Sequence, residues 1–518
     1  MIYNLKIFTL LMISILTFSC MDIDVENLNE PDASDALQSP GDVESLIAGS
    51  FKTFHNATES WDGPNGLSVL ADELTCSWGN AAMKDLSSEP RQAYTNDDSY
   101  IDIWHIRQPW TIYSAISSVN DGLSALLSET SPVVIGVNGR DTQRAIAMAR
   151  FIQGISYCYL GSFFDQAYIV DENTDLEGEI GLSSHQEVTA KGIEFLEDCI
   201  TICNNNEFTV PPVGWLNGLE INNDYLARVC HSYIARNLAC SARTPAERTA
   251  VSAAEVIAHV DQGLLNDGED FGAYGDGFVS WFSDHRFISA FPPWMRADYK
   301  TIGLTDTSGN YQNWLSLPVE DRNEFEIETA DRRITGDEGP QSQGLYFNYA
   351  GPSPFRPDRG TYHFSFYVST RYFEYTQSGS QQFVTLSYRE MQLLKAEYLF
   401  YSGDKAGAAA IVNETRVGNG QLPLLSETAG DVEFFKWLKY EKKIECCVIP
   451  GLAYFDRRGW TGDPETGQET DLVSGSPIHF PVPSLDLTLG GLEIYTFGGG
   501  GEGSAPRVIE QFYLPDPQ

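Results

Sequence analysis

Cys20 is the residue whose type and position most directly indicate a chemical modification. It follows the apolar run 7–18 and the small residue Ser19, and Lys6 carries the only side-chain charge before it. This run of 12 residues is typical of a secretory signal and is shorter than the roughly 20 apolar residues that span a bilayer. A cysteine directly after the cleavage point predicts a lipoprotein whose mature chain begins at Cys20 and is acylated on its thiol and its new amino group. The alternative is an ordinary secretory signal with an incidental cysteine.

Residue patterns that support catalysis are missing from the sequence. It contains no phosphate-binding GxxxxGK(S/T) loop, no HExxH metal motif and no GxSxG nucleophile motif. The eight histidines are scattered, so none suggests a metal cluster or a catalytic triad. Among 72 carboxylates a pair suited to glycoside hydrolysis is always available and therefore uninformative. We predict a binding protein that needs no cofactor. A surface glycoside hydrolase and a calcium ion held by loop carboxylates stay open as alternatives.

The eight cysteines after Cys20 raise the question of disulfides in an exported chain. Several lie in helix-like apolar patterns, where a free cysteine behaves as a small hydrophobic residue. Cys199 and Cys203 recur at helical spacing, Cys446 and Cys447 are adjacent, and no CxxC pair is present. We therefore predict buried free thiols and no zinc site.

The chain is strongly acidic, with 33 basic and 72 acidic residues and a formal net charge of −39. Such a surface repels nucleic acid and anionic lipid at long range, so we expect no nucleic-acid partner. A content of 42% hydrophobic and 12% aromatic residues is typical of a folded protein. The charge also favours neutral ligands over anionic ones, although one local basic pocket could override the mean field.

Helices must position any site, because apolar residues recur at spacings of three and four along much of the chain. In the strongest segment, Met148, Ile152 and Ile155 follow this period and small residues such as Gly154 and Gly161 interleave with them. Helices are predicted over 41–54, 104–127, 144–164, 190–203, 225–239, 253–265, 388–401 and 404–417. The paired helices resemble degenerate tetratricopeptide units, which stack into a continuous core. A general helical bundle is the alternative.

A different kind of segment interrupts these helices. Residues 271–375 contain Trp281, Trp294 and Trp314, with many tyrosines, phenylalanines, glycines and prolines. Alternating aromatic and polar residues at 362–370 predict short strands. A structureless loop of this length is improbable in a compact domain unless it is functional. We interpret the segment as a surface elaboration on the helical scaffold.

Several segments together resemble one known family. They are NLNEP at 27–31, ARFIQGISYCYLGSFFDQAYIV at 149–170, the stretch 387–423, LKYEKKIECCVIPGLAYFDRRGW at 438–460 and HFPVPSLDLTL at 479–489. In this order, and with the lipoprotein start, they resemble the SusD/RagB family of outer-membrane nutrient-binding lipoproteins. The organisation expected from this resemblance is a signal peptide at 1–19, an acidic tether at 20–40 and one SusD-like domain at 41–518, with a loop-rich ligand-binding insertion at about 271–380.

The resemblance implies a mainly α fold with four tetratricopeptide-like helix pairs and a ligand site in the loop-rich half. It also implies a cell-surface location, lipid-anchored in the outer membrane, and a SusC-like TonB-dependent transporter as partner. The family has no catalytic residues. Its ligands are typically oligosaccharides, and a peptide or another nutrient is the alternative ligand class.

The same resemblance places the two sides of the site in 74–94 and 278–314. Sugars present apolar faces that stack on aromatic rings and hydroxyl groups that need a few fixed polar partners. From these regions the expected ligand-binding residues are Trp78, Asn80, Trp281, Arg286, Trp294 and Trp314. The competing interpretation of each tryptophan is a place in the core, because most of the area of a tryptophan is usually buried.

Other conspicuous residues are assigned to the scaffold. Trp104, Trp110, Trp437 and Trp460 lie in helix-like patterns or in the 438–460 motif, and we predict that they pack. Arg457 and Arg458 stand out in an acidic chain. Their place in the same motif predicts structural ion pairs with the helical units.

Overall fold

The computed structural model describes residues 37–60, 62–76, 82–97, 105–353, 364–462 and 470–506. The predictions for Cys20, Trp78, Asn80 and Trp104 lie outside the described residues. No helix within these ranges is long and apolar enough to cross a membrane.

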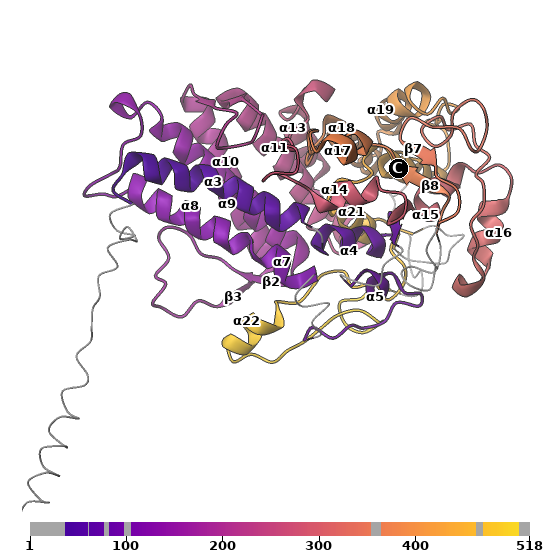
Figure 1. The fold of residues 1–518 in the computed structure, drawn as a ribbon, viewed down its shortest axis with the longest axis horizontal. Coiled ribbons are helices and arrows are strands. Elements are labelled where there is room, and N and C mark those ends of the chain that lie inside the picture. The colour runs from indigo at the N-terminus through magenta and orange to yellow at the C-terminus, as the bar shows by residue number, and fades with distance from the viewer. Residues whose placement is uncertain are drawn as a thin grey trace, which may run out of the picture.

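The fold is mainly α, as predicted, and its scaffold is a row of helix pairs (Figure 1). Within each pair the helices pack together, and α8, α10 and α13 contact the first helix of the next pair. The pairs are α3 (Pro40–Glu59) with α8 (Ile112–Leu126), α9 (Thr142–Phe163) with α10 (His185–Asn205), α11 (Asn223–Cys240) with α13 (Ala253–Asp261), and α18 (Tyr388–Tyr401) with α19 (Lys405–Gly418). This arrangement confirms the tetratricopeptide-like stacking.

Small residues set the close approach of α9 and α10. A Cβ atom on Gly154 would lie 2.6 Å from Cγ of Leu196, and one on Gly192 would lie 2.7 Å from the backbone nitrogen of Cys158. Neither position has room for a side chain, which explains why small residues alternate with large apolar ones along α9. The predicted role of Gly154 is confirmed.

Helix boundaries follow local capping chemistry. Ser387 accepts a hydrogen bond from the Glu390 backbone at the start of α18, and Asp404 does the same for Gly407 at the start of α19. The predicted helix 104–127 is wrong as one element within the described residues. It is divided into α7 (Arg107–Trp110) and α8, with Thr111 between them.

The loop-rich half has a hydrophobic cluster of its own. Buried Tyr299, Trp314, Phe347 and Tyr367 belong to it, and Ile444 of α20 (Asp431–Glu445) joins it to the scaffold. Figure 1 shows α15, α16, β7 and β8 on the side away from the helices α3, α8, α9 and α10. The elements of this half are α14 (Asp284–Ser289), β6 (Met295–Ala297), α15 (Tyr299–Ile302), α16 (Asn310–Ser316), β7 (Phe347–Tyr349), β8 (Tyr367–Ser369) and α17 (Phe373–Ser378).

Short strands tie the insertion together, as predicted. Antiparallel β7 and β8 place Phe347 opposite Ser369, and β6 pairs with β1 from the N-terminal part of the chain. The remaining strands and α-helices are β1 (Leu74–Cys76), α4 (Asp62–Leu70), α5 (Met83–Ser87), β2 (Gln166–Tyr168), β3 (Leu182–Ser184), β4 (Thr209–Val210), β5 (Ile221–Asn222), α12 (Pro245–Ala250), α21 (Leu452–Gly459) and α22 (Ser484–Leu489).

All eight cysteines after Cys20 fall within the described residues, and each is free and buried. Burial raises the pKa of the Cys158 and Cys230 thiols, and it raises that of Cys240 to about 11. The predicted buried free thiols are confirmed.

Candidate functional site

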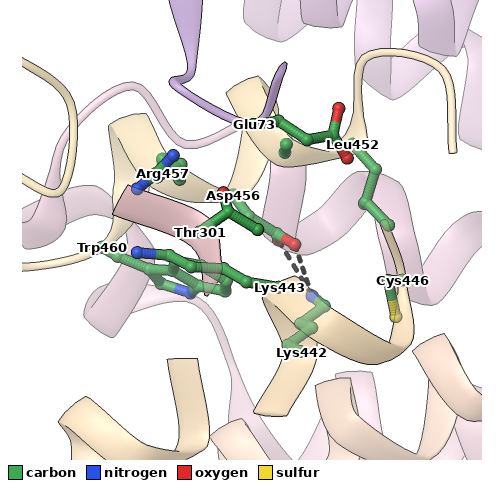
Figure 2. Close-up of a pocket in the computed structure, with 10 residues that line it drawn as sticks. Glu73, Thr301, Lys442, Lys443, Cys446, Leu452, Asp456, Arg457 and Trp460 are labelled. Carbon is green, nitrogen blue, oxygen red and sulfur yellow. Dashed lines mark hydrogen bonds and ion pairs between the residues drawn. The ribbon is translucent and has the colours of Figure 1, made fainter. Parts of the chain in front are cut away.

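The 438–460 motif surrounds a small buried cavity of about 20 Å³ beside α20 and α21. Figure 2 shows Lys442 pointing toward Asp456 within it, and the Nζ atom lies 2.9 Å from the carboxylate. Arg248 Nη2 lies 2.9 Å from the same carboxylate, and Arg248 Nε lies 2.8 Å from Glu397. All four side chains are buried. A space of this size suits one water molecule at most, so the motif joins α12, α18, α20 and α21 and does not form a ligand pocket.

Arg457 and Arg458 also serve the scaffold. Arg457 Nε donates to Asp471 at 2.8 Å, an ion pair whose carboxylate lies in the segment after α21 and not in a helix as predicted. Arg458 forms no ion pair among the described residues. Its guanidinium donates to the backbone carbonyls of Ser162 and Ile478, both at 2.9 Å, and of Cys240 at 2.6 Å. The structural role predicted for both is confirmed, although the partners of Arg458 are carbonyl groups instead of carboxylates.

The two regions expected to form the ligand site meet at the β1–β6 strand pair. Leu74 lies opposite Ala297, and Cys76 lies opposite Met295. The region 74–94 therefore leaves β1 at Cys76, opposite Met295, and Met295 directly follows Trp294 in the sequence. Trp78 comes two positions after Cys76 in the sequence, outside the described residues.

Four aromatic rings at this end of the strand pair form a continuous surface, which we call the aromatic row. Its members Phe278, Phe287, Phe291 and Trp294 touch in sequence order, with ring centroids 5.8, 5.7 and 4.9 Å apart. Phe278 is 46% exposed, and the other three are half-buried. Partly exposed aromatic rings on a preformed surface suit the apolar faces of sugars.

The loop that carries Phe278 is stabilised by hydrogen bonds from its backbone to the side chain of Asp276. The Asp276 carboxylate accepts hydrogen bonds from the backbone of Val279, Ser280 and Trp281, each at 3.0 Å. Phe278 has a φ of 64°, a left-handed conformation that costs a non-glycine residue about 1–3 kcal/mol. Such strain persists where surrounding contacts enforce it, so the ring is held in its place before any ligand arrives.

A polar group lies next to the aromatic row. Asp284, one helical turn before Phe287 on α14, is half-buried, and loss of water around it raises its pKa. Its charge acts on Tyr375, whose hydroxyl accepts a hydrogen bond from the Ser283 backbone at 2.9 Å. The Asp284 carboxylate can accept hydrogen bonds from ligand hydroxyl groups, which the aromatic rings cannot.

Of the predicted ligand residues within the described ranges, Trp294 belongs to the aromatic row and three others are buried. Trp281 is 8% exposed and packs against Phe51 and His55. Trp314 is 2% exposed and lies between Tyr299 and the guanidinium of Arg322. These places favour packing for both tryptophans.

Arg286 is fully buried at the start of α14 and joins it to the end of α3. Its Nη2 lies 2.7 Å from Oε1 of Glu59 and donates to the Val384 carbonyl at 2.8 Å. Burial would raise the pKa of Glu59, but the charge and hydrogen bonds of Arg286 outweigh that effect and lower it. This contact and the full burial of Arg286 favour a positioning role over direct ligand binding, since Arg286 directly precedes Phe287 on α14.

The comparisons with known proteins bear on the fold. No model of a known protein family matches the chain, and no curated protein matches it. A SusD superfamily protein from Parabacteroides distasonis ATCC 8503 aligns over 89% of this chain and 98% of its own, with a TM-score of 0.58 at 12% identity. A second SusD superfamily protein, from Bacteroides thetaiotaomicron VPI-5482, aligns over 88% of this chain and 98% of its own, with a TM-score of 0.57 at 14% identity. The chain has a SusD-like fold.

On this SusD-like fold, Phe278, Phe287, Phe291 and Asp284 are further candidate site residues, which the sequence alone did not indicate. A signal for part of the row was present, because Phe287, Phe291 and Trp294 recur at spacings of four and three. That period alone does not say which side of a segment faces water. Among the described residues, no group of histidine, cysteine and carboxylate side chains could hold a metal ion.

Proposed function

We propose that this chain is a cell-surface glycan-binding protein that captures oligosaccharides. The observation that carries the proposal is the aromatic row, which is solvent-accessible, continuous and built on a SusD-like fold. Stacking supplies affinity for the apolar faces of sugar rings, and Asp284 supplies a polar partner for hydroxyl groups. Trp78 and Asn80 complete the proposed site from the N-terminal region.

The proposed location and partner rest on sequence. The signal 1–19 and Cys20 support a lipid anchor in the outer membrane, and several acyl chains give stable attachment where one gives marginal binding. The resemblance to SusD-like proteins supports delivery of the ligand to a SusC-like TonB-dependent transporter. Replacing Cys20 with alanine should abolish incorporation of labelled fatty acid and release the protein from the membrane. Co-purification of the wild-type protein with a TonB-dependent transporter tests the partner.

A glycan array followed by calorimetry tests the binding function. We expect saturable binding to at least one oligosaccharide, and Trp78→Ala and Trp294→Ala should each weaken it by roughly tenfold or more, which corresponds to about 1.4 kcal/mol. A peptide pool measured in parallel gives the opposing outcome, since binding to peptides alone would overturn the proposal. New reducing ends after incubation with the bound glycan would show a hydrolase instead.

A further inference from the structure

A cleft of about 480 Å³ lies at the other end of the β1–β6 strand pair from the aromatic row, where Asp72 precedes β1 and Lys300 follows β6. Its walls come from α15, α16, α20 and the segment around Asp471. The charged residues that line it are the cations Lys300, Arg322, Lys436, Lys439, Lys443 and Arg457 and the carboxylates Asp72, Glu89 and Asp471. Among the described lining residues there are therefore six cations for three carboxylates, whereas the whole chain has 33 basic and 72 acidic residues.

The three carboxylates of the cleft are each shared by more than one cation. Asp471 lies 3.1 Å from Lys439, 2.5 Å from Lys443 and 2.8 Å from Arg457. One negative charge therefore faces three positive ones at this wall. Because the side chains are largely buried, water screens the surplus less than it would at an open surface.

The opposite wall is balanced among the described lining residues, with the cations Lys300 and Arg322 and the carboxylates Asp72 and Glu89. Glu89 pairs with Lys300 and lies 3.3 Å from Arg322. Asp72 lies 3.3 Å from Lys300 and also 3.1 Å from Arg91, which stands behind the cleft. The surplus of positive charge therefore lies at the Asp471 wall and not at this one.

The titration of Lys443 reflects this surplus. Burial and the neighbouring charges of Arg457 and Lys439 lower the pKa of Lys443 to about 7, although Asp471 acts in the other direction. Burial makes the largest contribution to this shift, and Asp471 is the carboxylate that opposes it. An anion in the cleft would add a second negative charge and would raise the pKa of Lys443.

We propose that this cleft binds the carboxylate or sulfate groups of an acidic oligosaccharide. The saccharide part of the assignment rests on the proposed function, whereas the anionic part rests on the cleft alone. A volume near 480 Å³ falls in the range of about 300–1,000 Å³ typical of small-ligand sites. Tyr311 and Leu315 add apolar surface, and Gln312 and Thr470 add polar groups for hydroxyls.

The acidic remainder of the chain restricts which anions reach the cleft. A net charge of −39 repels long polyanions such as nucleic acids at long range. A short oligosaccharide with a few charges experiences less of that repulsion and can bring its charged groups into the cleft. The proposal for this cleft therefore differs from the expectation of neutral ligands that the mean charge gives.

Calorimetry with length-matched ligands tests the proposal. The probes are oligogalacturonate for carboxylates, a sulfated galactan oligosaccharide for sulfates, a neutral galactan oligosaccharide and an oligoglutamate peptide. We expect at least one acidic oligosaccharide to bind tenfold or more tightly than the neutral one. That preference should shrink as sodium chloride rises from low to high concentration, because salt screens the charges.

Variants assign the binding to the cleft. Lys436→Gln, at a half-buried position of α20, should weaken binding of the acidic ligand by threefold or more. Lys395→Gln is the matched control, because Lys395 is also half-buried and lies in an ion pair with Asp261 away from the cleft. It should leave affinity unchanged. Melting curves of both variants show whether any loss arises from unfolding.

Proton uptake gives a second readout. At pH 7.5, binding measured in buffers of different ionisation enthalpy should show uptake of protons by the wild-type protein and less uptake by Lys443→Gln. Acidic-ligand binding that Lys436→Gln does not alter and that takes up no protons would overturn the cleft assignment.

The outcomes separate this inference from the proposed function. Binding of the neutral oligosaccharide alone would overturn the acidic ligand and leave the proposed function intact. Binding of oligoglutamate alone, lost in Lys436→Gln, would overturn the acidic oligosaccharide as the ligand of the cleft, and the glycan array would then decide the proposed function. Binding of none of the probes would overturn the inference, and the glycan array would then decide the proposed function.

Discussion

Arg286 and Glu59 form a buried ion pair between the two halves of the molecule, with Nη2 2.7 Å from Oε1 and Nε 2.9 Å from Oε2. Glu59 is the last residue of α3, and Arg286 lies in α14 directly before Phe287. The position of the aromatic row therefore depends on a charge pair anchored in the helical scaffold.

Glu59→Gln should destabilise the protein strongly. The change leaves the Arg286 guanidinium buried without its carboxylate, a situation that costs about 3–5 kcal/mol. Chemical denaturation measures the loss. Glu414→Gln is the matched control, because Glu414 is 57% exposed in its pair with Arg389 and such pairs contribute at most about 1 kcal/mol. Equal losses in the two variants would contradict the role of the pair.

Trp294→Ala and Trp314→Ala should have opposite effects. Trp294 is a half-buried member of the aromatic row, so its truncation should cost on the order of 1–3 kcal/mol of glycan binding and less stability than the loss of a core tryptophan. Trp314 is 2% exposed, so its truncation should cost about 3–5 kcal/mol of unfolding free energy. Trp437→Ala is the control matched for burial, because Trp437 is also half-buried but packs under Arg416 in the scaffold. It should leave affinity intact. A lowered melting temperature of Trp294→Ala together with normal glycan affinity would show that Trp294 belongs to the core.

The stability of the protein should rise between pH 7 and pH 9 through Lys443. Its native pKa is lowered to about 7 by burial and by Arg457 and Lys439, whereas an unfolded lysine titrates at about 10.4. In this window the unfolded chain binds more protons, so the free energy of unfolding increases with pH. Urea denaturation at several pH values should show a shallower rise for Lys443→Gln than for the wild type. Lys395→Gln should keep the wild-type slope, and parallel curves for all three proteins would refute the expected titration.

The eight buried thiols should resist modification in the folded protein. Reaction requires an accessible thiolate, and burial raises the pKa of Cys158 and Cys230 above the usual range. With a Cys20→Ala chain, a thiol reagent should react only after denaturation and should then detect all eight cysteines. A smaller number in denaturant without reductant would reveal a disulfide.

Much of the scaffold could be predicted from sequence, because helical periodicity is a local property. The helix predicted at 388–401 has the observed bounds of α18, and 144–164 differs from α9 by two residues at its start. The small residues of α9 correctly indicated close packing, since a Cβ on Gly154 would meet Leu196. Likewise, the buried free cysteines followed from their apolar surroundings in the sequence.

The residues that face a ligand could not be selected in the same way. Trp281 and Trp294 have similar aromatic neighbours in sequence, yet Trp281 is covered by Phe51 and His55 of α3 while Trp294 stays half-exposed. Phe51 and His55 lie more than 200 positions from Trp281 in the sequence, so no local pattern predicts that they cover it.

By itself, the sequence determined the helical scaffold, the buried thiols and the structural role of the 438–460 motif, because periodicity, composition and motif order are read along the chain. Only the tertiary structure decided which aromatic rings reach solvent and that cations at 300, 322 and 436–443 gather in one cleft of an acidic protein. The physical reason is that exposure and local electrostatic potential depend on neighbours in space, and folding brings those neighbours together from distant parts of the chain.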